Sequence, residues 1–139
     1  MKIGRHRILT QDCEFGIAQI VEIAIRALSP AVNDTFTSVG CVDWAADALL
    51  VAADVSLTDG CWYDRDSKLR LRVPCLRLER LVKMTFDQIR QAAADNLAVL
   101  IRILDAIRRL TPRMQTEATV QALIDQADAV REAASTHVL

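Results

Sequence analysis

The chain has 139 residues, a length that suits one domain with its own hydrophobic core. Hydrophobic residues make up 52% and aromatic residues only 4%, a balance that favours helices over sheet. With 25% charged residues and a formal net charge of -1, the composition excludes a disordered chain and a strongly basic nucleic-acid-binding protein. The mean hydropathy of +0.18 is high for a small domain that faces water on every side.

Residues 1–11 are polar and basic, and they predict an extended lead-in to a first helix. That helix is expected to begin next to Asp12, whose carboxylate can cap its first turn. Within residues 17–28 the polar side chains form one narrow stripe, which predicts a helix buried on nearly every side. These polar residues are Gln19, Glu22 and Arg26. We expect this helix at the centre of a bundle, or packed on a second subunit or a membrane region.

The second helix is expected over about Thr35 to Ala53, with Asn33-Asp34 as its cap. Its acidic residues fall on one face and its apolar residues on another. The acidic residues are Asp43, Asp47 and Asp54, and the apolar ones are Val39, Val42, Ala46, Leu49 and Leu50. Gly16 and Gly40 lie inside helical patterns, where glycine costs stability, so we expect close helix contacts at both.

A β-hairpin is predicted at 60–74, between the second and third helices. Asp59-Gly60 signals a turn, and apolar and basic residues alternate from Leu69 to Val73 with the period of a strand. Because a two-stranded hairpin is marginally stable alone, it is expected to lean on the helices.

Three more helices are expected, over about 76–94, 97–110 and 116–134. Their spacing predicts a set of core-facing residues. These are Leu78, Leu81, Val82, Ile89 and Ala92; Leu97, Leu100, Ile101, Leu104 and Ile107; and Val120, Leu123, Ile124, Ala127 and Val130. Residues 1–139 are therefore expected to form a single, mainly α domain. It is a helical bundle of about five helices with a short β-hairpin inserted between helices two and three.

The chain is expected to be soluble and cytoplasmic. Its two most apolar segments, within the first two helices, are interrupted by charge, whereas a membrane-spanning helix needs about 20 predominantly apolar residues. Asp12 and Glu14 stand where a secretory signal needs an apolar run. The four cysteines have no CxxC spacing, which predicts reduced and mostly buried thiols. No metal or cofactor is expected, since His6 and His137 lie near opposite termini.

The residues around the first two helices resemble those of a known family. The specific part is the run Ala27-Leu28-Ser29-Pro30-Ala31-Val32-Asn33-Asp34, with Gly4-Arg5, Gln11-Asp12 and Phe15-Gly16 before it. Residues 4–110 are in this respect similar to the soluble C-terminal part of DUF2254, a bacterial family described as predicted membrane proteins of unknown function. The resemblance implies that membrane-spanning helices precede this region in the natural polypeptide, and it implies no activity. Cys13 and Thr35 stand where the family has proline, which preorganises a helix start, so softer turns are expected here.

The strongest candidate ligand site is the loop from Ser29 to Thr37. Free amides at a helix N-terminus can hold an anion, and an arginine can add bidentate contacts to a phosphate or carboxylate. The predicted ligand-binding residues are Arg5, Asp12, Gln19, Ser29, Asn33, Asp34 and Thr37. The alternative is structural: the loop ends one helix and caps the next, and Arg5 pairs with Asp12.

Two further groups have both a functional and a structural interpretation. Asp43 and Asp47, one turn apart, can share a cation, or they form a solvated face that pairs with an arginine from elsewhere in the chain. The hairpin arginines form a basic strip that can touch anionic lipid headgroups, whereas few neighbouring aromatics and the slightly negative charge argue against nucleic acid. This strip consists of Arg65, Arg70 and Arg72, with Arg77 and Arg80 beyond it.

Three functions are compatible with these patterns. The first is a non-enzymatic cytoplasmic interaction or regulatory domain of a membrane protein, acting as a homo-oligomer or by packing against its membrane region. The second is a sensor of small anions or metabolites that uses the Ser29–Thr37 loop. The third is a hydrolase with Asp12 or Asp34 as a base. We predict the first, because the sequence contains neither a nucleophile elbow nor a glycine-rich phosphate loop, and no catalytic residue is assigned.

Overall fold

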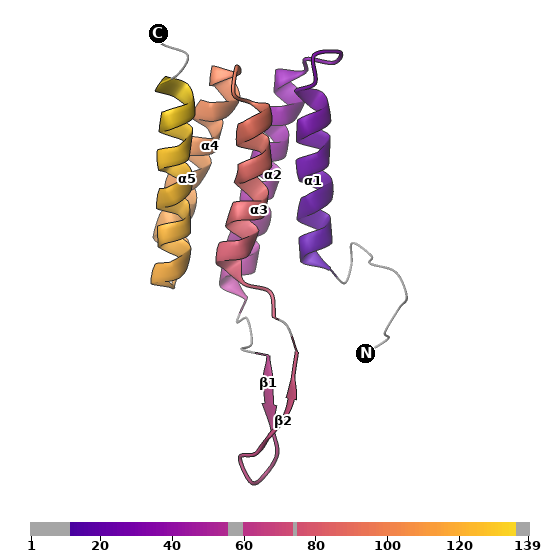
Figure 1. Ribbon diagram of the computed structural model, residues 1–139, viewed down its shortest axis with the longest axis vertical. Helices are drawn as coiled ribbons and strands as arrows, with labels where there is room; N and C mark the ends of the chain where they lie inside the picture. The colour runs from indigo at the N-terminus through magenta and orange to yellow at the C-terminus, as the bar shows by residue number, and fades with distance from the viewer. Residues whose placement is uncertain (1–11, 56–59, 74, 136–139) are drawn as a thin grey trace.

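The computed structural model describes residues 12–55, 60–73 and 75–135 (Figure 1). Its helices are α1 (Cys13–Ala27), α2 (Thr35–Asp54), α3 (Leu78–Ala92), α4 (Leu97–Leu110) and α5 (Glu117–Ser135), and its strands are β1 (Cys61–Tyr63) and β2 (Leu69–Arg72). A short 3-10 helix, η1 (Thr111–Arg113), follows α4. The predicted mainly α fold, with the hairpin between the second and third helices, is confirmed. The predicted extended lead-in lies outside the described residues.

Polar side chains cap the starts of α1, α2, α4 and α5, the last through Thr116 Oγ1, which accepts from the Thr119 amide at 3.3 Å. The Phe15 amide donates to Asp12 Oδ1 at 2.9 Å at the start of α1, and the Thr37 amide donates to Asp34 Oδ1 at 3.0 Å at the start of α2. The Asn96 side chain likewise accepts from the Val99 amide in α4. A short polar side chain at this position satisfies an amide that the helix itself leaves without a partner. The start of α3 has no such side chain, and it begins at Leu78, two residues later than expected.

The five helices form two layers (Figure 1). Helices α1, α3 and α5 run in one direction in the front layer, and α2 and α4 run in the other direction behind them. Side chains from all five helices fill the space between the layers. Fully buried examples are Ile17, Leu49, Phe86, Ile103 and Leu123. Burial of apolar side chains at this interface is the main source of stability for such a fold.

Helix α1 lies at one edge of the bundle, beside α2 and α3, and not at its centre (Figure 1). Its buried residues, Ile17, Val21, Ala24 and Ala27, follow one face, while Ile23 is 48% exposed. The expectation that this helix lies at the centre of the bundle is therefore wrong, whereas its packing on a second subunit or a membrane region stays a prediction. A narrow polar stripe shows how little of a helix is polar, but it does not show how much of the helix its neighbours cover.

The core face of α4 is also rotated from its predicted position. Leu97 and Ile101 were expected inside, yet they are 61% and 57% exposed. The buried residues are Val99, Leu100, Ile103, Ala106, Ile107 and Leu110. Because the start of α4 is apolar on every side, its spacing fits two faces equally well. The observed face is the one that lets Arg102 and Arg109 contact Asp43 of α2. Ala92 and Ile124 were likewise expected in the core and are exposed.

The hairpin extends beyond the end of the bundle and does not lean on the helices as expected (Figure 1). All four residues of β2 are exposed. Gly60 adopts a positive φ of 74°, and its carbonyl accepts from the Val73 amide at 2.8 Å. At the tip, the Asp64 carboxylate accepts from the Asp66 and Lys68 amides. Local hydrogen bonds of this kind hold a hairpin that has little packing of its own.

The prediction of a close helix contact at Gly40 is wrong. A methyl group placed on Gly40 would meet nothing within 4 Å. The glycine therefore lies on an open part of α2.

Candidate functional site

The Ser29–Thr37 loop forms a tight connection that caps α2. The Val32 and Asn33 amides donate to the Ser29 carbonyl at 3.0 and 2.8 Å, and Asn33 adopts a positive φ of 50°. The Thr37 hydroxyl donates to Asp34 Oδ2 at 2.6 Å. This hydrogen bond and the one from the Thr37 amide lower the pKa of Asp34. The Asp34 carboxylate thus occupies the N-terminus of α2, the position at which an anionic ligand would bind.

The other predicted ligand-binding residues do not converge on this loop. Asp12 caps the opposite end of α1, about 22 Å away along the helix axis, and Gln19 is exposed part-way between. Arg5 lies outside the described residues. Ser29, Asn33, Asp34 and Thr37 are therefore brought together, whereas Asp12 and Gln19 cannot share a small ligand with them. Ligand binding by the loop stays a prediction, and capping accounts for the contacts observed.

Two arginines of α4 form ion pairs with the acidic residues Asp43 and Asp47 of α2. Asp43 accepts from Arg102 Nε and Nη2 at 2.7 and 2.6 Å, a bidentate pair, and from Arg109 Nη2 at 3.1 Å. Arg109 Nη1 also lies 3.8 Å from Asp47. The hydrogen bond and charge of Asp43 raise the pKa of Arg102. The two interpretations of the acidic pair were a shared cation and a solvated face that pairs with an arginine. The observed geometry matches the second. Among the described residues, no three metal-binding side chains are grouped.

A pocket of about 340 Å³ lies at the end of α1, where Asp12, Cys13 and Glu14 face Cys75, Arg77 and Arg80. Glu14 and Arg80 form an ion pair at 3.0 Å across it. The described cysteines carry thiols, as expected, but only Cys41 is buried, so the expectation of mostly buried thiols is wrong. Burial raises the pKa of the Cys41 thiol, which makes it a poor nucleophile.

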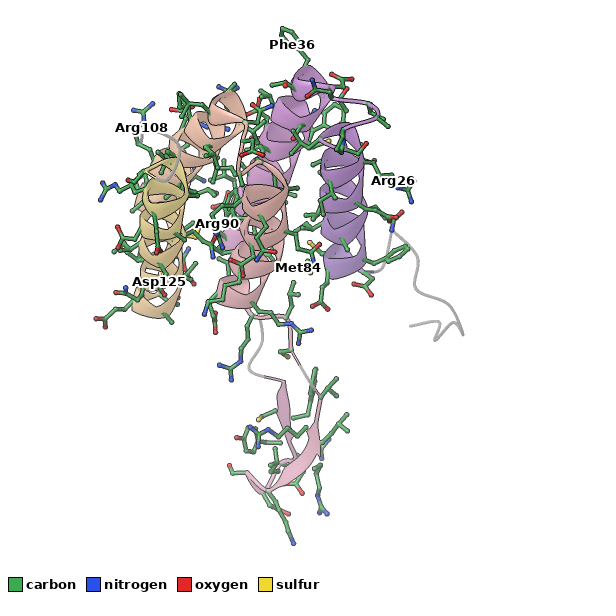
Figure 2. The ribbon with its side chains drawn as sticks, turned by 45° about the horizontal axis from the view of Figure 1, so that its top comes forward. Arg26, Phe36, Met84, Arg90, Arg108 and Asp125 are labelled. Atoms are coloured by element: carbon green, nitrogen blue, oxygen red, sulfur yellow. The ribbon has the colours of Figure 1, made fainter. Side chains whose placement is uncertain are left out.

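The outward sides of α2 and α4 carry exposed apolar side chains, two of which, Leu97 and Ile101, the helical spacing places in the core. They are Phe36, Trp44, Val51 and Val55 on α2 (the last at its C-cap), and Leu97 and Ile101 on α4. We call these six residues, with Gly40 between the two aromatics, the α2–α4 outer face. Phe36 is 90% exposed and points away from the bundle (Figure 2). Trp44 is 64% exposed.

The two helices hold this face together as one surface. They run parallel and side by side: the Asn96 side chain donates to Thr35 Oγ1 at 2.7 Å near their starts, and Arg113 pairs with Asp54 at 2.9 Å near their ends. Between these contacts lie the Asp43 and Arg102 pair already described. The remaining three helices cover the opposite sides of α2 and α4 (Figure 1). The apolar residues of the outer face therefore lie on the side of the α2 and α4 layer that faces away from the other helices.

A signal for this face was present in the sequence. Phe36, Gly40, Trp44, Asp47 and Val51 follow one another at intervals of three and four residues, so they share one side of a helix. On that helix they lie with the acidic residues and away from Val42, Ala46 and Leu49. Residues 17–28 contain fewer polar residues than α2, and the expectation of a helix packed on a second subunit therefore fell on them instead.

By length and composition alone, α2 is the one helix among the described residues that could cross a membrane. The charged residues Asp43 and Asp47 predict instead that this segment does not span a membrane. In the structure one side of α2 packs in the bundle, where Ser38, Val42 and Leu49 are fully buried. Core helices of soluble proteins pass the same test, so the finding carries little weight for the location of this segment.

Comparison with known proteins places the chain in a family. The model of DUF2254, described as a predicted membrane protein, matches residues 1–109. Uncharacterized proteins of Mycobacterium tuberculosis and Mycobacterium bovis are each 34% identical over 108 residues, which is 76% of this chain and 21% of theirs. The chain thus spans about a fifth of the length of these relatives. No solved structure matches it. The chain belongs to the DUF2254 family of predicted membrane proteins.

Proposed function

We propose that this chain is a cytoplasmic interaction module of a membrane protein, and that it acts by self-association through the α2–α4 outer face and not by catalysis. The observation that carries the proposal is the exposure of Phe36 and Trp44, 90% and 64%, in one row on α2. Large exposed aromatic side chains are typical of protein interfaces.

The size of the face supports a second copy as its occupant. The exposed parts of its six apolar residues offer roughly 700 Å², close to the about 800 Å² per partner that a stable interface of standard size buries.

The order of residues along α2 suits a twofold pair. Gly40 leaves a notch between Phe36 and Trp44, and one turn of helix separates each from the next. In an antiparallel pair of α2 helices, the Trp44 ring of each copy fills the Gly40 notch of the other, since a twofold axis makes every contact reciprocal. The Asp43–Arg102 pair lies beside this contact and gives it a polar border.

Light scattering over a range of concentrations tests the proposal. We expect a dimer for the natural chain and a monomer for the double variant Phe36→Ser/Trp44→Ser. Ile124→Ser is the matched control, because Ile124 is an exposed apolar residue of α5 outside the face. It should leave the dimer intact. A natural chain that stays monomeric at high concentration, or a double variant that still dimerises, contradicts the proposal.

A further inference from the structure

The hairpin exposes an unusual number of large apolar side chains for a segment of its size. Trp62, Tyr63, Leu69, Leu71 and Val73 are each between 40% and 59% exposed. The strand register pairs Trp62 with Leu71 and Tyr63 with Leu69, so the apolar side chains meet in two cross-strand pairs. The hairpin extends beyond the ends of the helices, so these pairs are presented away from the bundle (Figure 1).

The same hairpin is also a basic segment in a chain whose net charge is -1. Residues 60–73 contain four basic and two acidic residues, which gives a charge of +2. One acidic residue, Asp64, is occupied at the tip, where it accepts from Arg70 Nε at 2.6 Å in addition to its two amides. This arrangement lowers the pKa of Asp64. Arg65, Lys68 and Arg72 are exposed.

We propose that this hairpin binds the surface of a bilayer that contains anionic phospholipids. Trp62 and Leu71 enter the boundary between headgroups and acyl chains, where tryptophan is favoured because its ring is apolar and its N–H is polar. Arg65 and Arg72 hydrogen-bond lipid phosphates, and their long side chains reach the headgroups from either side of the hairpin. Each strand satisfies part of its backbone through the other, which lowers the cost of entering the interface.

Charge complementarity and position favour a membrane over other partners. Anionic lipids attract exposed lysine and arginine, whereas a protein partner that fits this hairpin would need both an acidic and an apolar surface. The family is described as predicted membrane proteins, which agrees with a bilayer as the partner. The inference concerns the hairpin alone and does not depend on self-association through the α2–α4 outer face.

The two tryptophans, Trp44 and Trp62, allow a direct test. In the full chain carrying Trp44→Phe, all tryptophan emission comes from Trp62. We expect this emission to shift to shorter wavelength when vesicles of phosphatidylcholine and phosphatidylglycerol, two to one, are added. Vesicles of phosphatidylcholine alone should produce a much smaller shift, because the electrostatic attraction is missing. Salt should weaken binding to the mixed vesicles.

Variants separate the contributions. Arg65→Gln and Arg72→Gln should each weaken binding to the mixed vesicles about fivefold, the effect expected of one basic residue near an anionic surface. Arg131→Gln, an exposed arginine of α5, is the matched control and should have no effect. An emission that does not change with mixed vesicles overturns the proposal. So does an equal shift with phosphatidylcholine alone, or a shift that follows protein concentration without lipid, which would mean that the hairpin binds another copy.

Discussion

The open position of Gly40 leads to a prediction whose sign is unusual for a buried-core helix. Replacing glycine by alanine inside a helix lowers the conformational freedom of the unfolded chain and favours the helix by about 0.5–1 kcal/mol. At Gly40 nothing lies within 4 Å of the added methyl group, so no clash offsets this gain. For a domain of this size, the Gly40→Ala variant should unfold about 2–4 °C higher.

The measurement is thermal unfolding followed by circular dichroism, at a concentration where light scattering shows a monomer. At high concentration the same variant should associate more weakly, because the methyl group partly fills the notch proposed for Trp44. Opposite effects of one substitution on folding and on association would distinguish an open face from a core position.

Gly60→Ala is the matched control, because the same chemical change should there have the opposite effect. Gly60 has a positive φ, and an added methyl group would lie 2.1 Å from the Val73 carbonyl oxygen. We expect faster hydrogen exchange of the Val73 amide, which donates to the Gly60 carbonyl. If Gly40→Ala lowers the unfolding temperature of the monomer, another part of the chain covers this side of α2, and the reasoning is refuted.

Three further predictions concern the fold. Asp43→Asn should lower the melting temperature more than Asp47→Asn, because Asp43 accepts three hydrogen bonds from arginines and the Asp47 side chain is 62% exposed; added Ca²⁺ should shift neither variant. Asp34→Asn should reduce the loss of stability in acid. The lowered pKa of Asp34 means that its carboxylate stabilises the fold above its ordinary pKa near 3.8, an effect lost as the pH falls through the lowered value, as acid titration of unfolding would show. Phe86→Ala should cost about 3–5 kcal/mol in urea unfolding, because Phe86 is fully buried; a cost below about 1 kcal/mol would contradict the described core.

Local signals in the sequence were enough to predict the order and type of the elements. Asp12, Asp34 and Asn96 mark helix starts because each satisfies a nearby amide within its own chain segment. The alternation from Leu69 to Val73 similarly predicted the strand β2. These signals depend on neighbours a few residues apart, so no knowledge of the tertiary arrangement was needed.

The rotation and position of the helices depended on distant contacts. Asp43 and Arg102 are 59 residues apart, and their pairing turns Ile101 outward. No local pattern reports such a pairing, and the apolar start of α4 allowed the wrong face. For the same reason the predicted ligand site combined residues from both ends of α1, Asp12 and Asn33, which a helix of this length keeps apart.

The central claim is that the α2–α4 outer face binds a second copy of the chain, and Trp44 can report on it directly. In the variant Trp62→Phe, all tryptophan emission comes from Trp44, which is 64% exposed in the single chain. We predict that this emission shifts to shorter wavelength as protein concentration rises, in step with the mass measured by light scattering. An emission that stays constant while the mass doubles would place the contact elsewhere, and a mass that stays that of a monomer would show that this face does not bind a second copy.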